Sequence, residues 1–178
     1  MLEEHFPSTI HDDLLCAFGL NAEVLAVERE SPQTFSSETT ERRERDPAFR
    51  RHVLSAYEYR CAFSGFRIAM SGQFAGCEAA HVQWHCYDGP DTIANGIALE
   101  PTIHKLFDIG AWTLTDDRRI LISRDLTGVD KTIERIRGRH GQPLSSPIQG
   151  EAEVSKEFIR WHREPDQGGV FRQPAIPI

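Results

Sequence analysis

The stretch "NGIALEPTIHKLFDIG", residues 95–110, predicts an apolar segment that leads into a helix. It opens with Asn-Gly, a dipeptide typical of turns, and the apolar run "IAL" follows. Pro101 suits the first turn of a helix, because the N–H groups of that turn have no partner within the helix in any case. Gly110 is the stop signal at the other end.

Two residues of this predicted helix can bind a metal. His104 and Asp108 are four positions apart, so both side chains project from one face. An imidazole nitrogen and a carboxylate oxygen in that arrangement can reach one divalent cation. Asp108 also lies near the helix C-terminus, where the helix dipole disfavours an acid unless a cation is close. The four cysteines match no CxxC zinc pattern, so a structural zinc knuckle is not predicted.

Short strands are predicted around this region. The strand-like segments are "RIAM" (67–70), "CEAAHV" (77–82), "AWTLT" (111–115) and "RILIS" (119–123). The last two form a predicted β-hairpin. Two strands followed by a helix would bring His81, at the end of the second segment, opposite His104 and Asp108. Small strands mixed with helices predict an α+β fold.

The composition divides the chain into three parts. Residues 1–45 combine a short helical segment at 11–19 with a polar linker, and residues 46–130 hold the motifs described above. Residues 131–178 contribute a helix at about 151–163 and a Pro/Gly-rich tail. The middle part opens with a helix through about residue 57, because Asp-Pro is an N-cap signal. Its apolar residues share one helical face: Phe49, Val53, Leu54 and Tyr57.

The bulk composition is that of a soluble globular protein. The 178 residues are 39% hydrophobic and 26% charged. No apolar run reaches 18 residues, so no membrane span is expected. The N-terminus lacks a basic region followed by an apolar one, which favours a cytoplasmic location.

The charge of the chain is unevenly distributed. The net charge of −7 does not by itself indicate nucleic-acid binding. However, residues 41–52 contain five arginines, and residues 131–140 contain a lysine and three arginines. Each run is either a basic patch that meets phosphates or an ordinary solvated helix face.

In combination, these motifs resemble the HNH endonuclease family. The resemblance is carried by "YEYRCAFSG", "EAAHV", "NGIALEPTIHKLFDIG" and "RILIS", and it covers about residues 50–125. It is strongest toward a bacterial, restriction-type subgroup, in which "AAH" leads to "NG", a hydrophobic residue and then "HxxFD-G". A weaker similarity lies in "FIRWHRE" (158–164). The resemblance implies an HNH ββα-metal core flanked by helices and a β-hairpin.

The resemblance also implies a role for each matching residue. His81 would be the general base that takes a proton from the attacking water, a task that suits a neutral imidazole. His104 and Asp108 would hold the cation at the scissile phosphate. His104 would therefore be both a catalytic residue and a metal ligand. Asn95 would hold the long loop by backbone hydrogen bonds and so keep His81 directed at the phosphorus.

One position departs from the family pattern. Many relatives have a metal-binding aspartate or histidine just before the catalytic histidine, whereas this chain has Ala80. Glu78 shares a strand face with Ala80 and would either substitute or form a supporting salt bridge. Two protein ligands completed by water and phosphate suit Mg²⁺ best. Mn²⁺, Ni²⁺ and Zn²⁺ are alternatives at a His/Asp site.

The implied substrate is DNA, and two classes of function remain open. His85, Lys105, Arg50 and Arg51 are candidate contacts to DNA, although each also fits an ordinary loop or surface position. The chain is then either a divalent-metal-dependent endonuclease or an HNH-fold binding module of a larger system that does not cleave. A homodimer is a further expectation, because one ββα site cuts one strand at a time.

Overall fold

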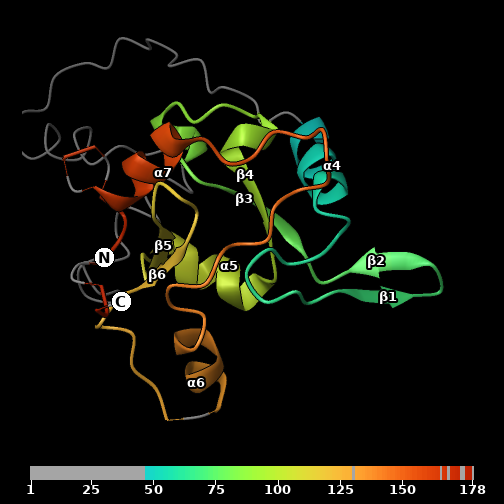
Figure 1. Ribbon diagram of the computed structural model, residues 1–178. Coiled ribbons are helices and arrows are strands. Elements are labelled where there is room, and N and C mark those ends of the chain that lie inside the picture. Colours follow the sequence, from blue (N-terminus) through green and yellow to red (C-terminus); the bar gives the residue numbers. More distant parts are fainter. Residues whose placement is uncertain (1–46, 130, 165, 168, 173–174, 178) are drawn as a thin grey trace, which may run out of the picture. The chain divides into compact units, whose positions relative to one another are not determined.

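Short helices and small antiparallel sheets make up the described part of the chain, which confirms the predicted α+β fold. The computed structural model describes residues 47–129, 131–164, 166–167, 169–172 and 175–177. Figure 1 shows how the elements follow one another. In chain order they are α4 (Pro47–Ala56), β1 (Ile68–Met70), β2 (Gln73–Ala75), β3 (Glu78–His81), η2 (His85–Tyr87), η3 (Ile93–Asn95), β4 (Gly96–Leu99), α5 (Pro101–Asp108), β5 (Trp112–Leu114), β6 (Ile120–Ile122), α6 (Lys131–Arg137) and α7 (Lys156–Arg163).

Some expectations fall outside what the structure describes. The predicted helix at 11–19 and the polar linker after it lie outside the described residues. The predicted division of the chain at residues 45 and 130 stays a prediction. Within the described ranges, no helix is long and apolar enough to cross a membrane. The cytoplasmic location also stays a prediction.

Strands β3 and β4 and helix α5 form a ββα unit (Figure 1). The two strands pair in antiparallel register, and His81 lies opposite Gly96. All four residues of β4 are buried. Helix α5 lies against β3 and β5, and its buried residues are Ile103 and Phe107. The next residues along the helix, His104 and Asp108, therefore stand at the margin of this apolar stripe.

Helix α4 packs against β3 and β4 with the predicted apolar face. Its buried residues, together with the tyrosine that follows the helix, are Phe49, Val53, Leu54, Ala56 and Tyr57. Gly96 permits this close approach, because a Cβ there would lie 2.3 Å from Cγ2 of Val53. The Asn-Gly pair is thus not a hairpin turn. Its glycine begins β4 and leaves room for α4.

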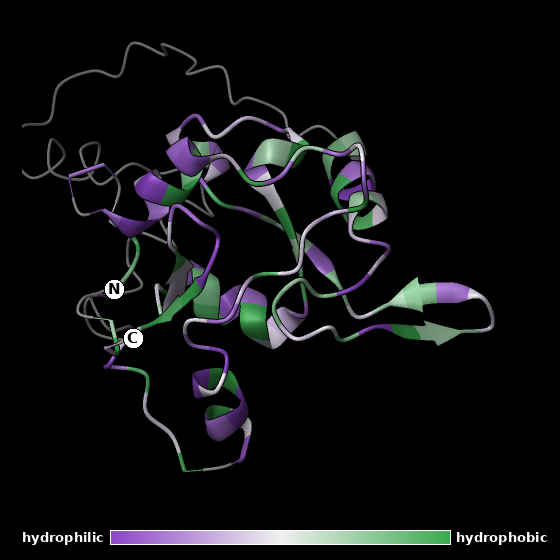
Figure 2. Cartoon of the chain, in the orientation of Figure 1, coloured by the Kyte–Doolittle hydropathy of each residue, from purple (hydrophilic) through white to green (hydrophobic). Residues whose placement is uncertain are grey.

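Strands β1 and β2 form a hairpin of their own, with a turn at Ser71 and Gly72. Both turn residues have positive φ angles, 53° and 79°, as a type I′ hairpin turn requires. All residues of the two strands are exposed, although Figure 2 shows that both strands are mainly hydrophobic. The sequence predicts β1 but not β2. Strand β1 therefore pairs with β2, and the strand that pairs with β3 is β4.

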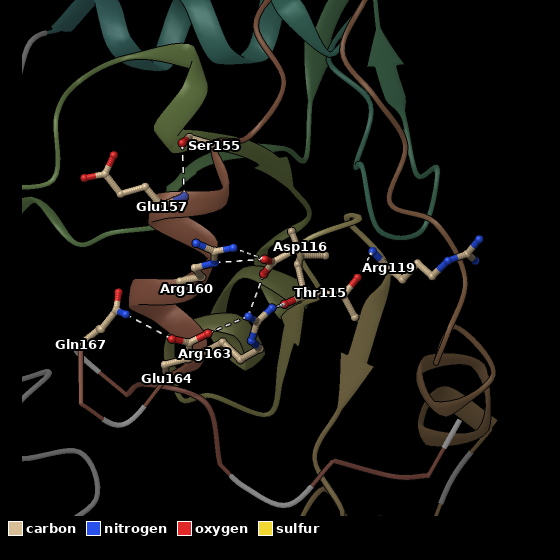
Figure 3. A network of polar contacts seen from close by, with 10 residues as sticks. Thr115, Asp116, Arg119, Ser155, Glu157, Arg160, Arg163, Glu164 and Gln167 are labelled. Atoms are coloured by element: carbon tan, nitrogen blue, oxygen red, sulfur yellow. Dashed lines mark hydrogen bonds and ion pairs between the residues drawn. The ribbon is translucent and has the colours of Figure 1, made fainter.

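The predicted hairpin of β5 and β6 is confirmed, and helix α7 is tied to its turn. Arg160 Nε donates to Asp116 Oδ2 at 3.0 Å, and Arg163 Nη2 donates to Asp116 Oδ1 at 2.8 Å (Figure 3). These hydrogen bonds lower the pKa of the Asp116 carboxyl to about 2. The helix is shorter than predicted, because Ser155 caps it by accepting a hydrogen bond from the N–H of Glu157.

A buried histidine joins α7 to the ββα unit. His162 is fully buried and stacks on Phe107 with 3.8 Å between ring centroids. Its Nδ1 lies 2.9 Å from Thr113 Oγ1, and its Nε2 lies 3.2 Å from the carbonyl oxygen of Phe107. Burial lowers the pKa of His162 to about 3, so the ring is neutral at ordinary pH. The weaker similarity in "FIRWHRE" therefore coincides with a packing contact.

Candidate active site

His81 ends strand β3 with its imidazole held from two directions. Its Nε2 lies 2.7 Å from Oδ1 of Asp91. The ring stacks on Phe49 of α4, with 3.9 Å between centroids and 16° between planes. The His81 side chain is 15% exposed, so the ring is shielded but still reaches the surface. Sequence reasoning missed Asp91. It is one of two acids in the loop at 82–94, and no spacing rule connects it with His81.

Asn95 is fully buried and holds both arms of that loop. Its Oδ1 accepts from the N–H of Gln83 at 2.8 Å. Its Nδ2 donates to the carbonyl oxygens of Gln83 at 2.9 Å and Pro90 at 3.0 Å. The Asn95 carbonyl also accepts from the N–H of Val82 at 2.9 Å. The side chain therefore joins the beginning of the loop to the segment that presents Asp91.

His104 lies between two carboxylates. Its Nδ1 is 2.7 Å from Oε2 of Glu78, and its Nε2 is 3.6 Å from Oδ1 of Asp108. The pKa of the Asp108 carboxyl is raised, chiefly because burial disfavours its charge, and Glu78 adds to this effect. His104 and Lys105 oppose it. A carboxylate in this environment gains from a cation placed beside it.

The donors on α5 fit a divalent cation that keeps most of its water. Two neighbouring ligands of one small cation lie about 3 Å apart, and the Nε2 of His104 and Oδ1 of Asp108 need little adjustment to reach that separation. Because an ionised Glu78 accepts a hydrogen bond from Nδ1–H, the lone pair of His104 is left on Nε2, toward Asp108. The described residues contain no group of three or more His, Cys, Asp or Glu side chains placed to hold a metal. The site therefore fits a cation that has two protein ligands, His104 and Asp108.

Ala80, where many relatives have a ligand, is part of the core. It is fully buried and lies opposite Ile97 in the β3–β4 register. Its methyl group packs in the same cluster of buried apolar side chains as Leu99 and Phe107. A polar ligand at this position would have to be desolvated within apolar surroundings. Packing therefore favours a small apolar residue here.

The four predicted DNA contacts occupy different environments. His85, in η2, is only 11% exposed, and its Nε2 lies 3.8 Å from Oδ2 of Asp91. Its ring centroid is 5.9 Å from that of His81, so it belongs to the same cluster. Arg50, Arg51 and Lys105 are exposed on α4 and α5. Arg50 Nη2 also donates to a backbone carbonyl oxygen, that of Cys77, at 3.4 Å.

The two clusters share strand β3. Glu78 begins the strand and contacts His104, whereas His81 ends it and contacts Asp91. Three residues of extended chain place the two Cα atoms about 10 Å apart. Helix α5 lies against the same strand. A single short strand thus presents both the histidine–aspartate pair and the partner of the predicted cation ligand.

Comparisons with known proteins give one family match and one similar structure. Residues 61–115 match the family model described as HNH endonuclease. A modification-dependent TagI restriction endonuclease of known structure is similar at 23% sequence identity and a TM-score of 0.47, over 67% of this chain and 37% of that one. This chain thus spans little more than a third of that protein's length. A search of curated proteins gives no match. The family match over residues 61–115 confirms the resemblance to HNH endonucleases that the sequence predicts.

Proposed function

We propose that this protein hydrolyses phosphodiester bonds of DNA with the help of a divalent cation. One observation supports this function above all others. His104 Nε2 and Asp108 Oδ1 lie 3.6 Å apart on a helix that packs against the strand presenting His81. A cation-binding pair and a general base on adjoining elements are what phosphodiester hydrolysis requires.

Each residue of the site has a separate task. His81 takes a proton from a water molecule as the water oxygen attacks the phosphorus and the bond to the leaving oxygen breaks. His104 and Asp108 hold the cation, and Glu78 fixes the tautomer of His104. When bound, the cation neutralises charge on the scissile phosphate and stabilises the leaving oxygen. Asn95 keeps the loop beside His81 in place.

Mg²⁺ is the cation we propose for the cell. Mg²⁺ binds through one or two carboxylates and keeps several waters, which suits a site with few protein ligands. The single imidazole nitrogen also admits Mn²⁺, Ni²⁺ or Zn²⁺. A panel of cations in a cleavage assay separates these choices.

Exposed basic side chains near the site would contact the DNA backbone. Arg50 and Arg51 on α4 and Lys105 on α5 are exposed. Guanidinium and ammonium groups bind phosphate oxygens without regard to base sequence. His85 lies beside Asp91 and would contact the strand near the cleaved bond. The proposed restriction role rests on the sequence resemblance alone, and we propose a homodimer because two sites are needed to cut two strands.

A non-cleaving HNH-fold module is the second candidate. Its support is Ala80, which is buried in the core where many relatives have a metal ligand. The net charge of −7 points the same way, because it does not attract DNA. Such a module would bind cations or partners through the same fold without hydrolysis.

Plasmid nicking across Mg²⁺, Mn²⁺, Ni²⁺ and Zn²⁺, with EDTA as a control, separates the two candidates. The endonuclease converts supercoiled DNA to nicked or linear forms in at least one cation and not in EDTA. Thermal stabilisation by a cation without nicking, on plasmids with and without modified bases, would favour the module. His104→Ala serves as the site variant and should neither nick nor gain stability from the cation.

A further inference from the structure

We propose that Asp91 is a positioning residue that sets the tautomer and direction of the His81 imidazole, so that Nδ1 takes the proton from the attacking water. This inference deepens the proposed function, because it rests on His81 acting as the general base. Asp91 itself touches neither the water nor the phosphate in this scheme. It acts through His81.

The hydrogen bond between the two residues fixes the tautomer. An ionised carboxylate can only accept hydrogen bonds, and Asp91 Oδ1 lies 2.7 Å from Nε2 of His81. Nε2 therefore carries the proton. A neutral imidazole has one N–H, so its lone pair is on Nδ1, and that nitrogen is the basic one. The side chains are 15% and 11% exposed, so water competes little for this bond.

The orientation of the His81 ring is also fixed. The Asp91 carboxylate acts on the ring edge, whereas Phe49 stacks on the ring face at 3.9 Å. Contacts on edge and face together determine both the tilt and the rotation of the imidazole. A base held in one orientation avoids the rate loss that comes from a misplaced proton acceptor.

The loop that bears Asp91 is held by hydrogen bonds and close packing. Asn95 Nδ2 donates to the carbonyl oxygen of Pro90, the residue just before Asp91. The N–H of Gly89 donates to the carbonyl oxygen of Trp84 at 3.0 Å. A Cβ on Gly89 would lie 1.9 Å from the carbonyl oxygen of Gln83, so the backbone passes there too closely for a larger residue. Asn95 therefore supports His81 by way of Asp91.

His85 is the competing partner of Asp91, and distance separates the two histidines. Its Nε2 is 3.8 Å from Oδ2, beyond hydrogen-bond range, whereas His81 Nε2 is 2.7 Å from Oδ1. Of these two contacts, only the one with His81 is a hydrogen bond.

The first test is the tautomer of His81, which does not depend on cleavage. Nitrogen-15 NMR of the full chain distinguishes a proton on Nε2 from one on Nδ1. The wild-type protein should show the Nε2–H form at a pH where the ring is neutral. Asp91→Asn should lose this preference, because an amide can either donate to or accept from Nε2. A wild-type His81 in the Nδ1–H form would overturn the inference, whatever the enzyme's activity.

The second test uses the nicking assay with wild type, Asp91→Asn, Asp91→Glu and the control Asp88→Asn. Asp88 is an exposed acid of the same loop with φ 61°, a conformation that asparagine tolerates. We expect Asp91→Asn to slow nicking by about 10- to 1,000-fold, because it removes part of the roughly 100- to 10,000-fold that general-base catalysis contributes. The acidic limb of its pH profile should move to lower pH, because the imidazolium loses a neighbouring negative charge.

The outcomes of these tests separate the inference from the proposed function. Asp91→Glu should recover part of the rate, and Asp88→Asn should match the wild type. An Asp91→Asn protein with the wild-type rate and pH profile would refute the inference and leave the nuclease intact. A wild type that cuts nothing, but whose His81 is in the Nε2–H form, would instead refute the proposed function.

Discussion

Nδ1 of His104 lies 2.7 Å from Oε2 of Glu78, and this contact joins helix α5 to the first residue of strand β3. The carboxylate directs the other ring nitrogen, Nε2, toward Asp108. Glu78 thus stands behind the predicted cation ligand as a hydrogen-bond partner. Such partners commonly raise the affinity of a histidine for metal.

Glu78→Ala should therefore weaken cation binding while the fold persists. We expect the dissociation constant for Mn²⁺, measured by calorimetry, to rise by about 10- to 100-fold. Glu78→Gln should lose less, because its amide oxygen can still accept a hydrogen bond from Nδ1–H. Glu134→Ala, an exposed acid on α6, is the matched control. Equal affinity in Glu78→Ala and wild type would remove Glu78 from the site.

Asp108→Asn should have opposite effects on stability with and without the cation. Burial raises the pKa of the Asp108 carboxyl, so the charged form is disfavoured in the metal-free protein. The uncharged amide should leave the metal-free Tm unchanged or slightly higher. The rise in Tm on adding Mn²⁺ should disappear, because a carboxylate ligand is lost. Thermal unfolding with and without Mn²⁺ measures both effects, and a preserved Mn²⁺ shift would exclude Asp108 as a ligand.

Asn95→Ala should destabilise the loop at 82–94 and the domain as a whole. The change removes three side-chain hydrogen bonds and leaves partly buried backbone groups of Gln83 and Pro90 without these partners. We expect a loss of roughly 2–4 kcal/mol in the free energy of unfolding, measured with urea. Amide hydrogen exchange should increase most within this loop. An even rise in exchange across the protein would show that Asn95 does not stabilise this loop specifically.

His162 should make the stability of the protein fall in acid. The pKa of its buried ring is about 3, whereas an unfolded histidine has a pKa of about 6.5. Between these values the unfolded chain binds a proton that the folded chain does not, so the free energy of unfolding decreases as pH falls. The contribution should be a loss of about 2 kcal/mol between pH 7 and pH 5.

Urea unfolding of two variants at both pH values checks this prediction. His162→Gln should be less stable than wild type at pH 7 but should lose less stability on going to pH 5. His52→Gln, at an exposed position on α4, should keep the wild-type difference. A wild-type pH dependence in His162→Gln would assign the acid sensitivity to other groups.

Local patterns were enough to predict β3, α5 and their neighbours, whereas β4 was expected only as an apolar segment. The apolar face of α4, the β5–β6 hairpin and the helix opened by Pro101 all follow from periodicity or from stop and start signals. The strand β2 does not, because its residues are exposed and its pairing depends on the Ser-Gly turn before it. The Asn95-Gly96 dipeptide helped to identify the family motif, but it does not form a hairpin turn in the structure.

The partners within the candidate site could not be predicted in the same way. The i and i+4 spacing of His104 and Asp108 brings them onto one helix face, so the helical period alone predicts their proximity. The contact of Asp91 with His81 depends instead on how the loop folds back under Asn95. The contact of Glu78 with His104 depends on the packing of α5 against β3. Tertiary contacts of this kind leave no periodic signal in one sequence.

The rate of plasmid nicking by His81→Ala, compared with wild type in the same cation, tests the central claim most directly. If His81 is the general base, the variant should remain folded in the presence of the cation and should nick at least about 100-fold more slowly. Nicking by folded His81→Ala at the wild-type rate would contradict the account, because another group would then have to take the proton from water.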